Sequence, residues 1–377
     1  MDERDRQHLG RAIRLAERGH GLASPNPPVG AVVVAPDGRV VGEGWHEGPG
    51  TAHAEVAALR TAGAEAREGT VYSSLEPCDH TGRTGPCTAA LLSAGVARVL
   101  AGALDPNPLV DGRGLERLRA AGVVIETPVG ADPGDAELLD AAGRLIAGFA
   151  RHVRTGLPFV MLKMAATLDG KVAARDGTSR WITGEAARTA VHRLRASADA
   201  VMVGAGTVLA DDPSLTVRLD GYRGRQPLRV VVDGAGRVPA AGKLFDGEAP
   251  ILLATSDGTS QDRVRAWTDG GAEVWRPEDP SGGLVPLGPL VEHLGKRDVQ
   301  TLLIEGGPTL AWSAVREGVV DRVVVFLAPK LLGGRDAPGI VDGEGLAPVG
   351  SAIGLELRRV ERVGDDLMVE ADVHRDR

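Results

Sequence analysis

The sequence contains few aromatic residues and very little cysteine. Phe, Trp and Tyr together make up 3% of the 377 residues, so Val, Leu, Ile and Ala must fill most of the core. Two cysteines in a chain of this length exclude a disulfide framework. The charged residues 1–21 lack the apolar centre of a signal peptide, and no apolar run is long enough to cross a bilayer. We therefore expect a soluble, cytoplasmic protein with no membrane partner.

The sequence also lacks a basic excess. Its formal net charge is −8, whereas proteins that bind nucleic acid usually show a basic surface. A local basic pocket for a phosphate is compatible with this balance. Hydrophobic residues make up 43% of the chain, which is ample for packed cores, and the length predicts about two or three domains. These features argue against a nucleic-acid partner.

Both cysteines lie in one stretch, residues 51–87, with a histidine and a glutamate. His53, Cys78 and Cys87 are three good ligands for a tetrahedral zinc ion, and three protein ligands leave one position for a water. Zinc lowers the pKa of such a water towards neutrality. Glu55 follows His53 by two residues and can move protons at the same place. A His-x-Glu followed by Pro-Cys and a second Cys is the signature of zinc deaminases.

Other interpretations of this stretch remain open on the residues alone. His46 or His80 can supply a fourth ligand, which would make the zinc structural. The local pattern predicts Thr51 as an N-cap and Pro86 as an early helical position, which places His53 and Cys87 in the first turns of two helices. The positive ends of those helices would favour thiolates.

The sequence motifs around the three proposed zinc ligands give further information about the kind of site. They are SPNPPVGAVVV, GEGWHEGPG, CDHTGRTGPC and ALDPNPLVDGRG, and together they resemble the deaminase half of the bifunctional riboflavin-biosynthesis deaminase–reductase family. The second Cys follows the first by nine residues, a longer spacing than in most cytidine-deaminase-like proteins and typical of the riboflavin branch. Gly85 stands where that family more usually has Pro, and it touches no proposed ligand.

The resemblance implies a cytidine-deaminase-like domain and a set of substrate contacts. The implied contacts are Asn26, His46, His80, Arg83, Asp105 and Asn107. On the residues alone, Asn26 is more often a turn former, and Asp105 and Asn107 are equally well explained as a turn after a strand. A polar cluster at the end of a strand also fits ligand binding at the edge of an open α/β sheet.

The N-terminal part predicts a three-layer α/β/α domain, residues 1–153. The expected helices cover residues 2–18, 54–62, 114–121 and 132–151 together with one that starts at Cys87, and the expected strands cover 31–34, 40–42, 71–74, 98–101 and 123–126. The breaker-rich segment from Thr155 to Pro158 marks a boundary. A second α/β domain, residues 157–377, begins with a strand from Phe159 to Lys163.

Two glycine turns in the second domain resemble nucleotide-binding turns. Val201–Thr207 is a strand followed by Gly-x-Gly, and Leu302–Leu310 is a strand, a double glycine and a helix start. Glycines let the backbone approach a diphosphate, which the free N–H groups of a helix start can hold. Either segment alone is equally a tight strand–helix connection without a ligand.

Taken together, these segments look like the reductase half of the same family, whose fold is similar to dihydrofolate reductase. The resemblance implies that NADPH reduces the opened ribose of the substrate and covers residues from about Arg11 to Val363. The implied NADPH contacts are Ala165, Trp181, Thr207, Asp211, Gly307, Pro308 and Thr309, and the implied substrate contacts are Ser179, Arg195, Leu215, Arg218 and Glu305. Arg195 and Arg218 suit a phosphate clamp, although each alone would more often be a surface charge. Lys163 is a candidate for polarising the carbonyl that is reduced.

We therefore expect a bifunctional enzyme with zinc and NADPH as cofactors. It would deaminate 2,5-diamino-6-(5-phosphoribosylamino)pyrimidin-4(3H)-one and then reduce the ribosyl chain to give 5-amino-6-(5-phosphoribitylamino)uracil. A nucleic-acid base deaminase is a second hypothesis, but the acidic balance and scarce aromatics count against it. A zinc-stabilised nucleotide-binding module is a third, and it gives Glu55 no purpose. We also expect a homo-oligomer, a dimer or a tetramer.

Overall fold

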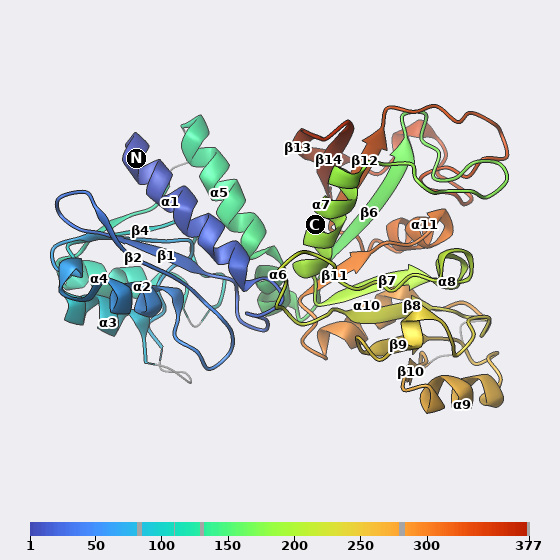
Figure 1. Ribbon diagram of the computed structural model, residues 1–377, viewed down its shortest axis with the longest axis horizontal. Helices are drawn as coiled ribbons and strands as arrows, with labels where there is room; N and C mark the ends of the chain where they lie inside the picture. The colour runs from blue at the N-terminus through green and yellow to red at the C-terminus, as the bar shows by residue number, and fades with distance from the viewer. Residues whose placement is uncertain (81–84, 109, 129–131, 279–282, 375–377) are drawn as a thin grey trace. The chain divides into compact units, whose positions relative to one another are not determined.

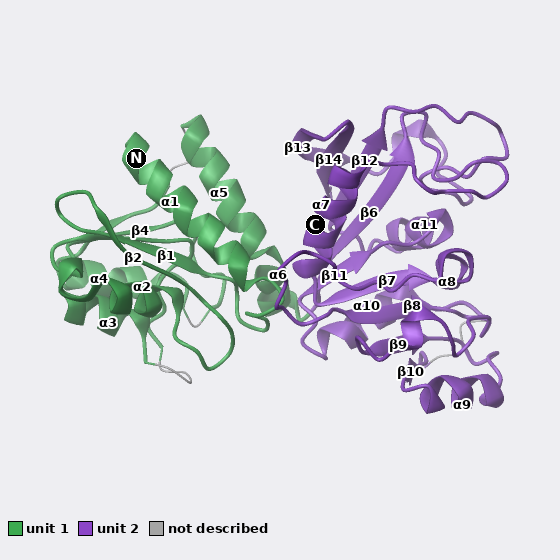
Figure 2. Ribbon diagram, in the orientation of Figure 1, with its two compact units in different colours: residues 1–156 green, residues 157–377 purple. Residues whose placement is uncertain are grey.

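The computed structural model describes residues 1–80, 85–108, 110–128, 132–278 and 283–374. The chain forms two compact units, Met1–Gly156 and Leu157–Arg377 (Figure 2). Among the described residues, no helix combines the length and the apolar character that a membrane span requires.

Unit 1 is built on one five-stranded sheet in the order β2-β1-β3-β4-β5. Strand β1 is antiparallel to both of its neighbours, and β3, β4 and β5 run parallel. The strands are β1 Gly30–Val34, β2 Val40–Trp45, β3 Thr70–Ser73, β4 Arg98–Ala101 and β5 Val124–Glu126. The parallel strands end at one edge of the sheet, so the loops that follow β3 and β4 lie next to each other.

Helices cover both faces of this sheet (Figure 1). Helices α1 and α5 pack on one face, where Leu9 and Ala142 meet Val32 and Leu100, while α2, α3 and α4 pack on the other. The helices are α1 Glu3–Ala16, α2 Ala54–Ala62, α3 Cys87–Ala94, α4 Arg113–Ala120, α5 Pro133–Leu145 and α6 Ala147–Thr155. The three-layer α/β/α arrangement expected from the sequence is confirmed.

Strand β2 continues past Gly42, where the sequence predicted its end, and runs to Trp45. Its glycines permit a close approach of α2. A Cβ built at Gly42 would lie 2.2 Å from the Ala58 carbonyl oxygen, and one at Gly44 would lie 2.5 Å from the Ala54 carbonyl oxygen. These residues are therefore glycine because a helix backbone lies against them, and they do not break the strand.

Three expectations about helix ends were wrong. Thr51 is not an N-cap, because its hydroxyl donates to the Gly48 carbonyl oxygen at 2.7 Å and α2 begins after His53. Pro86 lies at the N-cap of α3, outside the helix, in extended backbone. The single helix predicted over 132–151 is two helices that meet at Ile146. Gly143 and Gly148 flank this break, and glycine is a poor helix former.

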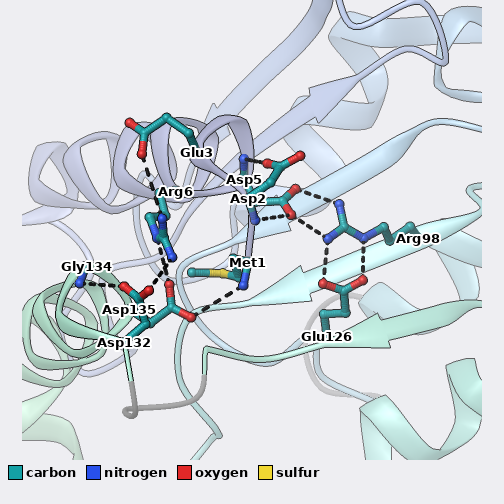
Figure 3. A network of polar contacts seen from close by, with 10 residues as sticks. All are labelled: Met1, Asp2, Glu3, Asp5, Arg6, Arg98, Glu126, Asp132, Gly134 and Asp135. Atoms are coloured by element: carbon teal, nitrogen blue, oxygen red, sulfur yellow. Dashed lines mark hydrogen bonds and ion pairs between the residues drawn. The ribbon is translucent and has the colours of Figure 1, made fainter.

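A network of charged groups joins α1 to the edge of the sheet (Figure 3). The Arg98 guanidinium on β4 donates to both carboxylate oxygens of Asp5, at 2.6 and 2.8 Å, and to Glu126 on β5 at 3.0 and 2.6 Å. The Tyr72 hydroxyl donates to Asp5 at 2.8 Å. The hydrogen bond from Arg98 outweighs burial and lowers the pKa of Asp5 from 3.8 to about 2.

Replacing Asp5 with Asn should destabilise unit 1 in a pH-dependent way. A carboxylate whose pKa falls on folding contributes stability above its unfolded pKa, and this contribution is lost as the pH falls from 3.8 through about 2. We expect Asp5→Asn to lower the free energy of unfolding by about 2 kcal/mol at pH 7 and by little at pH 2. Urea unfolding at both pH values measures the two costs, and equal costs would contradict this account.

Unit 2 contains, among its described residues, a nine-stranded sheet in the order β10-β9-β8-β7-β11-β6-β12-β14-β13. Strands from β10 to β12 are parallel, and β14 and β13 add an antiparallel hairpin at one edge. The strands are β6 Phe159–Thr167, β7 Ala200–Gly204, β8 Leu228–Val232, β9 Ile251–Ala254, β10 Glu273–Trp275, β11 Thr301–Ile304, β12 Arg322–Ala328, β13 Leu355–Val363 and β14 Asp366–Val373. The first of these is longer than the predicted Phe159–Lys163.

Helices again cover both faces of the sheet. The helices are α7 Glu185–Ala196, α8 Ala205–Asp211, α9 Gln261–Asp269, α10 Leu287–Gly295 and α11 Pro308–Arg316. Side chains of α10 and α11 pack with Val160 and Leu162 of β6 on one face, and side chains of α8 and α9 pack with Met161 on the other. Alternate residues of β6 thus face two cores, which explains its nearly continuous apolar sequence.

Candidate active sites

Unit 1 brings the three expected metal ligands together. His53 is the N-cap of α2, Cys87 is the first residue of α3, and Cys78 lies in the loop after β3. The His53 Nδ1 atom lies 3.2 Å from the Cys87 Sγ atom and 3.4 Å from the Cys78 Sγ atom, and all three atoms lie within 4.8 Å of one another. Ligands about 2.0–2.3 Å from a tetrahedral zinc have similar separations. One imidazole and two thiols therefore fit zinc in both geometry and chemistry.

Glu55 lies beside this cluster and is 3% exposed. The Cys87 thiol donates to the Glu55 Oε2 atom at 3.4 Å. Burial, together with the charge of Cys78, raises the pKa of Glu55 to about 7. Hydrogen bonds from Cys87 and His53 lower the pKa of the Cys78 thiol. A carboxyl group with a pKa near neutrality can both accept and donate a proton at physiological pH.

Asn26 and His46 contact each other beside the metal-ligand cluster. The Asn26 amide donates to the His46 Nε2 atom at 3.0 Å, and the His46 Nδ1 atom donates to the Ala52 carbonyl oxygen at 3.3 Å. His46 is 3% exposed, burial lowers its pKa, and its ring centroid lies 5.4 Å from that of His53. Both of its ring nitrogens are engaged, so His46 is not a fourth ligand here.

Asp105 and Asn107 lie in the loop after β4. The Asn107 backbone N–H donates to the Asp105 carboxylate at 2.8 Å. Burial raises the pKa of Asp105 to about 6; the charges of Glu76 and, less strongly, Cys78 add to this effect, while the hydrogen bond from Asn107 and the charge of His80 oppose it. His80 itself is exposed, and Arg83 lies outside the described residues. Asp105 is therefore close enough to the cluster to interact with the charge of Cys78.

Unit 2 contains a cavity of about 770 Å³. Its lining includes residues 163–165 in the middle of β6, Val203 near the end of β7 and residues 305–308 after β11, and α7 and α8 contribute to its walls. The predicted residues that line it are Lys163, Ala165, Ser179, Trp181, Arg195, Thr207, Asp211, Leu215, Arg218, Glu305, Gly307 and Pro308. Thr309 is the predicted residue that does not line it, although the adjacent Pro308 does. Residues from distant parts of the sequence therefore line one cavity.

A buried charge cluster forms the floor of this cavity. The Arg195 guanidinium donates to both carboxylate oxygens of Glu305, at 2.6 and 3.0 Å, and to the Thr216 carbonyl oxygen at 3.1 Å. The Lys163 Nζ atom lies 3.9 Å from Glu305. Burial opposes ionisation of Glu305, but the charges of Arg195 and Lys163 hold its pKa below the usual value. Burial lowers the pKa of Lys163.

The two glycine turns lie side by side at the cavity. Gly204 and Gly307 are the N-caps of α8 and α11, and neither helix start has a side-chain cap. A Cβ built at Gly307 would lie 3.8 Å from the Thr207 Oγ1 atom. Because the first N–H groups of a helix lack partners within the helix, two such starts around one cavity suit a diphosphate. These features fit a dinucleotide such as NADPH.

Sequence reasoning missed other residues of the cavity wall, among them Arg188 and His192. They share one face of α7 with Arg195, at helical spacings of four and three residues. The Arg188 guanidinium lies over the Trp181 ring, with its carbon 4.5 Å from the ring centroid. The Trp181 side chain is 64% exposed. Helical periodicity counted back from Arg195 could have identified both residues.

Two family models match the chain. The cytidine and deoxycytidylate deaminase zinc-binding region matches residues 2–103, and the RibD C-terminal domain matches residues 158–369. The riboflavin biosynthesis protein RibD of Escherichia coli (strain K12) is 41% identical over 374 residues, covering 96% of this chain and 98% of the relative. The RibD protein of Mycobacterium tuberculosis is 40% identical over 363 residues, covering 96% and 95%.

Solved structures are similar over the same length. Form 1 of Acinetobacter baumannii RibD has a TM-score of 0.81 at 36% identity and covers 99% of each chain. The diaminohydroxyphosphoribosylaminopyrimidine deaminase/5-amino-6-(5-phosphoribosylamino)uracil reductase of Thermotoga maritima has a TM-score of 0.82 at 33% identity, covering 98% of this chain and 99% of that one.

Proposed function

The chain belongs to the RibD family, the zinc- and NADPH-dependent deaminase–reductases of riboflavin biosynthesis, and we propose which of its residues carry each reaction. The proposed deaminase domain is residues 1–153, and the proposed reductase domain is residues 157–377. The cluster of His53, Cys78 and Cys87 with the buried Glu55 carries the first assignment. The charged cavity of unit 2 carries the second.

In the proposed deamination, His53, Cys78 and Cys87 hold zinc. When bound, zinc lowers the pKa of a coordinated water towards neutrality. Glu55 would take a proton from the water whose oxygen bonds to the ring carbon, and it would give a proton to the amine, which would leave that carbon as ammonia. The raised pKa of Glu55 suits both transfers.

The remaining unit 1 residues would orient the substrate. We assign this role to Asn26, His46, His80, Arg83, Asp105 and Asn107. The support is the contact between Asn26 and His46 and the position of Asp105 near the charge of Cys78. The proposed substrate is 2,5-diamino-6-(5-phosphoribosylamino)pyrimidin-4(3H)-one.

In the proposed reduction, the two glycine turns would hold the diphosphate of NADPH, which would supply the hydride. Ala165, Trp181, Thr207, Asp211, Gly307, Pro308 and Thr309 would contact it. Ser179, Arg195, Leu215, Arg218 and Glu305 would contact the phosphorylated substrate. Lys163 would donate a hydrogen bond to the oxygen of the carbonyl group whose carbon accepts the hydride, with Glu305 fixing the Lys163 ammonium group. The product is 5-amino-6-(5-phosphoribitylamino)uracil.

The experiment that tests both assignments follows ammonia release and NADPH oxidation in one reaction with purified protein. We expect ammonia first and then an equal amount of NADPH consumed. Ammonia without NADPH consumption would overturn the reductase assignment. If neither signal arises from protein that contains zinc, both assignments fail.

We also propose that the chain is a cytoplasmic homo-oligomer, a dimer or a tetramer. Strand β13 is an edge strand, and edge strands with exposed apolar side chains favour association. Leu355, Leu357 and Val360 of this strand are 51%, 67% and 59% exposed. Strand alternation and register place them on one face with Leu367 of β14, which is 42% exposed.

Replacing Leu357 with Asp should therefore shift the protein towards monomers. A charge placed within an apolar interface must be desolvated, which opposes association. Sedimentation velocity at several concentrations measures the shift. Leu284→Asp is the matched control, because Leu284 is equally exposed, at 67%, but lies just before α10. An unchanged distribution in the Leu357 variant would exclude this hairpin as the interface.

A further inference from the structure

Glu76 is a buried carboxylate that neither proposed reaction uses. It lies two residues before Cys78 and is 3% exposed. Its own N–H donates to the Ala103 carbonyl oxygen at 2.9 Å, which places it beside the segment that leaves β4. A charge buried this deeply is stable only when hydrogen bonds replace its water.

Three backbone N–H groups supply those hydrogen bonds, and all come from the segment after β4. The N–H of Asp105 donates to the Oε2 atom of Glu76 at 3.2 Å, and the N–H of Gly112 donates to the same atom at 3.0 Å. The N–H of Gly114 donates to the Oε1 atom at 3.1 Å. The carboxylate thus joins the beginning of the loop 105–112 to the start of α4.

The segment that carries Glu76 also packs closely against the start of α4. A Cβ built at Gly114 would lie 2.0 Å from the Pro77 carbonyl oxygen and 3.3 Å from the Glu76 Oε1 atom. On the other side of Cys78, the Asp79 carboxylate accepts from Arg117 of α4 at 2.5 Å. Two carboxylates therefore attach the segment that carries Cys78 to α4 and to the loop before it.

We propose that Glu76 is a positioning residue for deamination, which holds Asp105 and Asn107 at a fixed place relative to the metal cluster. One segment carries a metal ligand, the other carries two proposed substrate contacts, and Glu76 connects them through charge-assisted hydrogen bonds. The Asp105 N–H is itself one of the three donors, so its position follows that of the carboxylate. The inference rests on the proposed deaminase function of unit 1.

The test is the Glu76→Gln variant of the full chain, assayed with the diaminopyrimidinone ribosylamine phosphate. Gln has nearly the same size, but its amide NH₂ faces a backbone N–H, so the loop must move. We expect the KM for deamination to rise about tenfold or more, with a smaller fall in kcat, because small displacements of bound groups are costly. Zinc content and the reductase rate on deaminated substrate should be unchanged.

Two further variants separate positioning from general stability. Gly114→Ala displaces the same segment but keeps the Glu76 carboxylate, because the added methyl group would clash with the Pro77 carbonyl oxygen, and it should raise the KM in the same way. Asp5→Asn removes another buried carboxylate of unit 1, and it should lower stability without changing the KM.

The outcomes are distinct. A raised KM in Glu76→Gln and Gly114→Ala but not in Asp5→Asn supports the proposal. A wild-type KM in Glu76→Gln, an equal KM change in Asp5→Asn, or loss of zinc and of folded unit 1 in both loop variants overturns it. Absence of ammonia release by the unaltered protein would instead refute the proposed function itself.

Discussion

The Glu55→Gln variant should bind zinc normally and release almost no ammonia. Gln is nearly the same size as Glu but cannot take or give the proton that the reaction moves. General acid–base groups contribute about 10²–10⁴-fold to rates, so we expect a loss of deaminase kcat in that range. The ligands His53, Cys78 and Cys87 are unaltered, and zinc content per chain should stay that of the unaltered protein.

The reductase reaction provides the control for this variant. NADPH oxidation with already deaminated substrate should continue at the wild-type rate, because the cavity that we assign to it lies wholly within unit 2. Full deaminase activity in Glu55→Gln would refute the proposed mechanism. Loss of zinc together with activity would make Glu55 a contributor to the metal site instead.

The Lys163→Met variant should lose reductase activity and keep deaminase activity, which is the reverse of the result expected for Glu55→Gln. Met keeps much of the apolar stem and removes the ammonium group that lies 3.9 Å from Glu305. Loss of one positioned hydrogen-bond donor typically costs about 10²–10³ in kcat, and we expect a loss of that order in NADPH oxidation. Ammonia release should be unchanged.

Lys296→Met is the matched control for this prediction. Lys296 is exposed at the end of α10 and is not among the residues that line the cavity. Both variants should be assayed for NADPH binding by fluorescence as well as for turnover. Wild-type kcat in Lys163→Met would exclude Lys163 from the chemistry, while a loss of NADPH binding with normal kcat at saturation would make it a binding residue.

Local patterns in the sequence identified most of the elements that carry the sites. Apolar runs and breakers located β1, α2 and β4 almost to the residue, since these signals depend on neighbours in sequence. The family resemblance was needed to connect Arg195 with Glu305, which are 110 residues apart and meet only in the fold. The stretch from about 240 to 295, uninformative in sequence, contributes among its described residues the edge strand β10, its neighbour β9 and the helices α9 and α10.

The errors have a common physical cause. The predicted strand ends at Gly42 because a glycine has the same sequence signal whether it ends a strand or allows a helix backbone to pack against it. The sequence predicts Thr51 as a cap because its hydroxyl could serve either of two turns. Glu76 carried no signal at all, because its partners are backbone N–H groups that any residue can supply. Such contacts are visible only when distant segments are placed in space.

The contact of α2 with Gly42 and Gly44 has a consequence for how harmful substitutions should be distributed. Helix α2 begins directly after His53 and carries Glu55 in its first turn. The distance between α2 and β2 therefore sets the positions of the His53 and Glu55 side chains. A single methyl group added at either glycine would push α2 away from β2. In a survey of inactivating variants, these two positions should rank with the metal ligands, although neither glycine is among the residues that we assign to zinc or to the substrate.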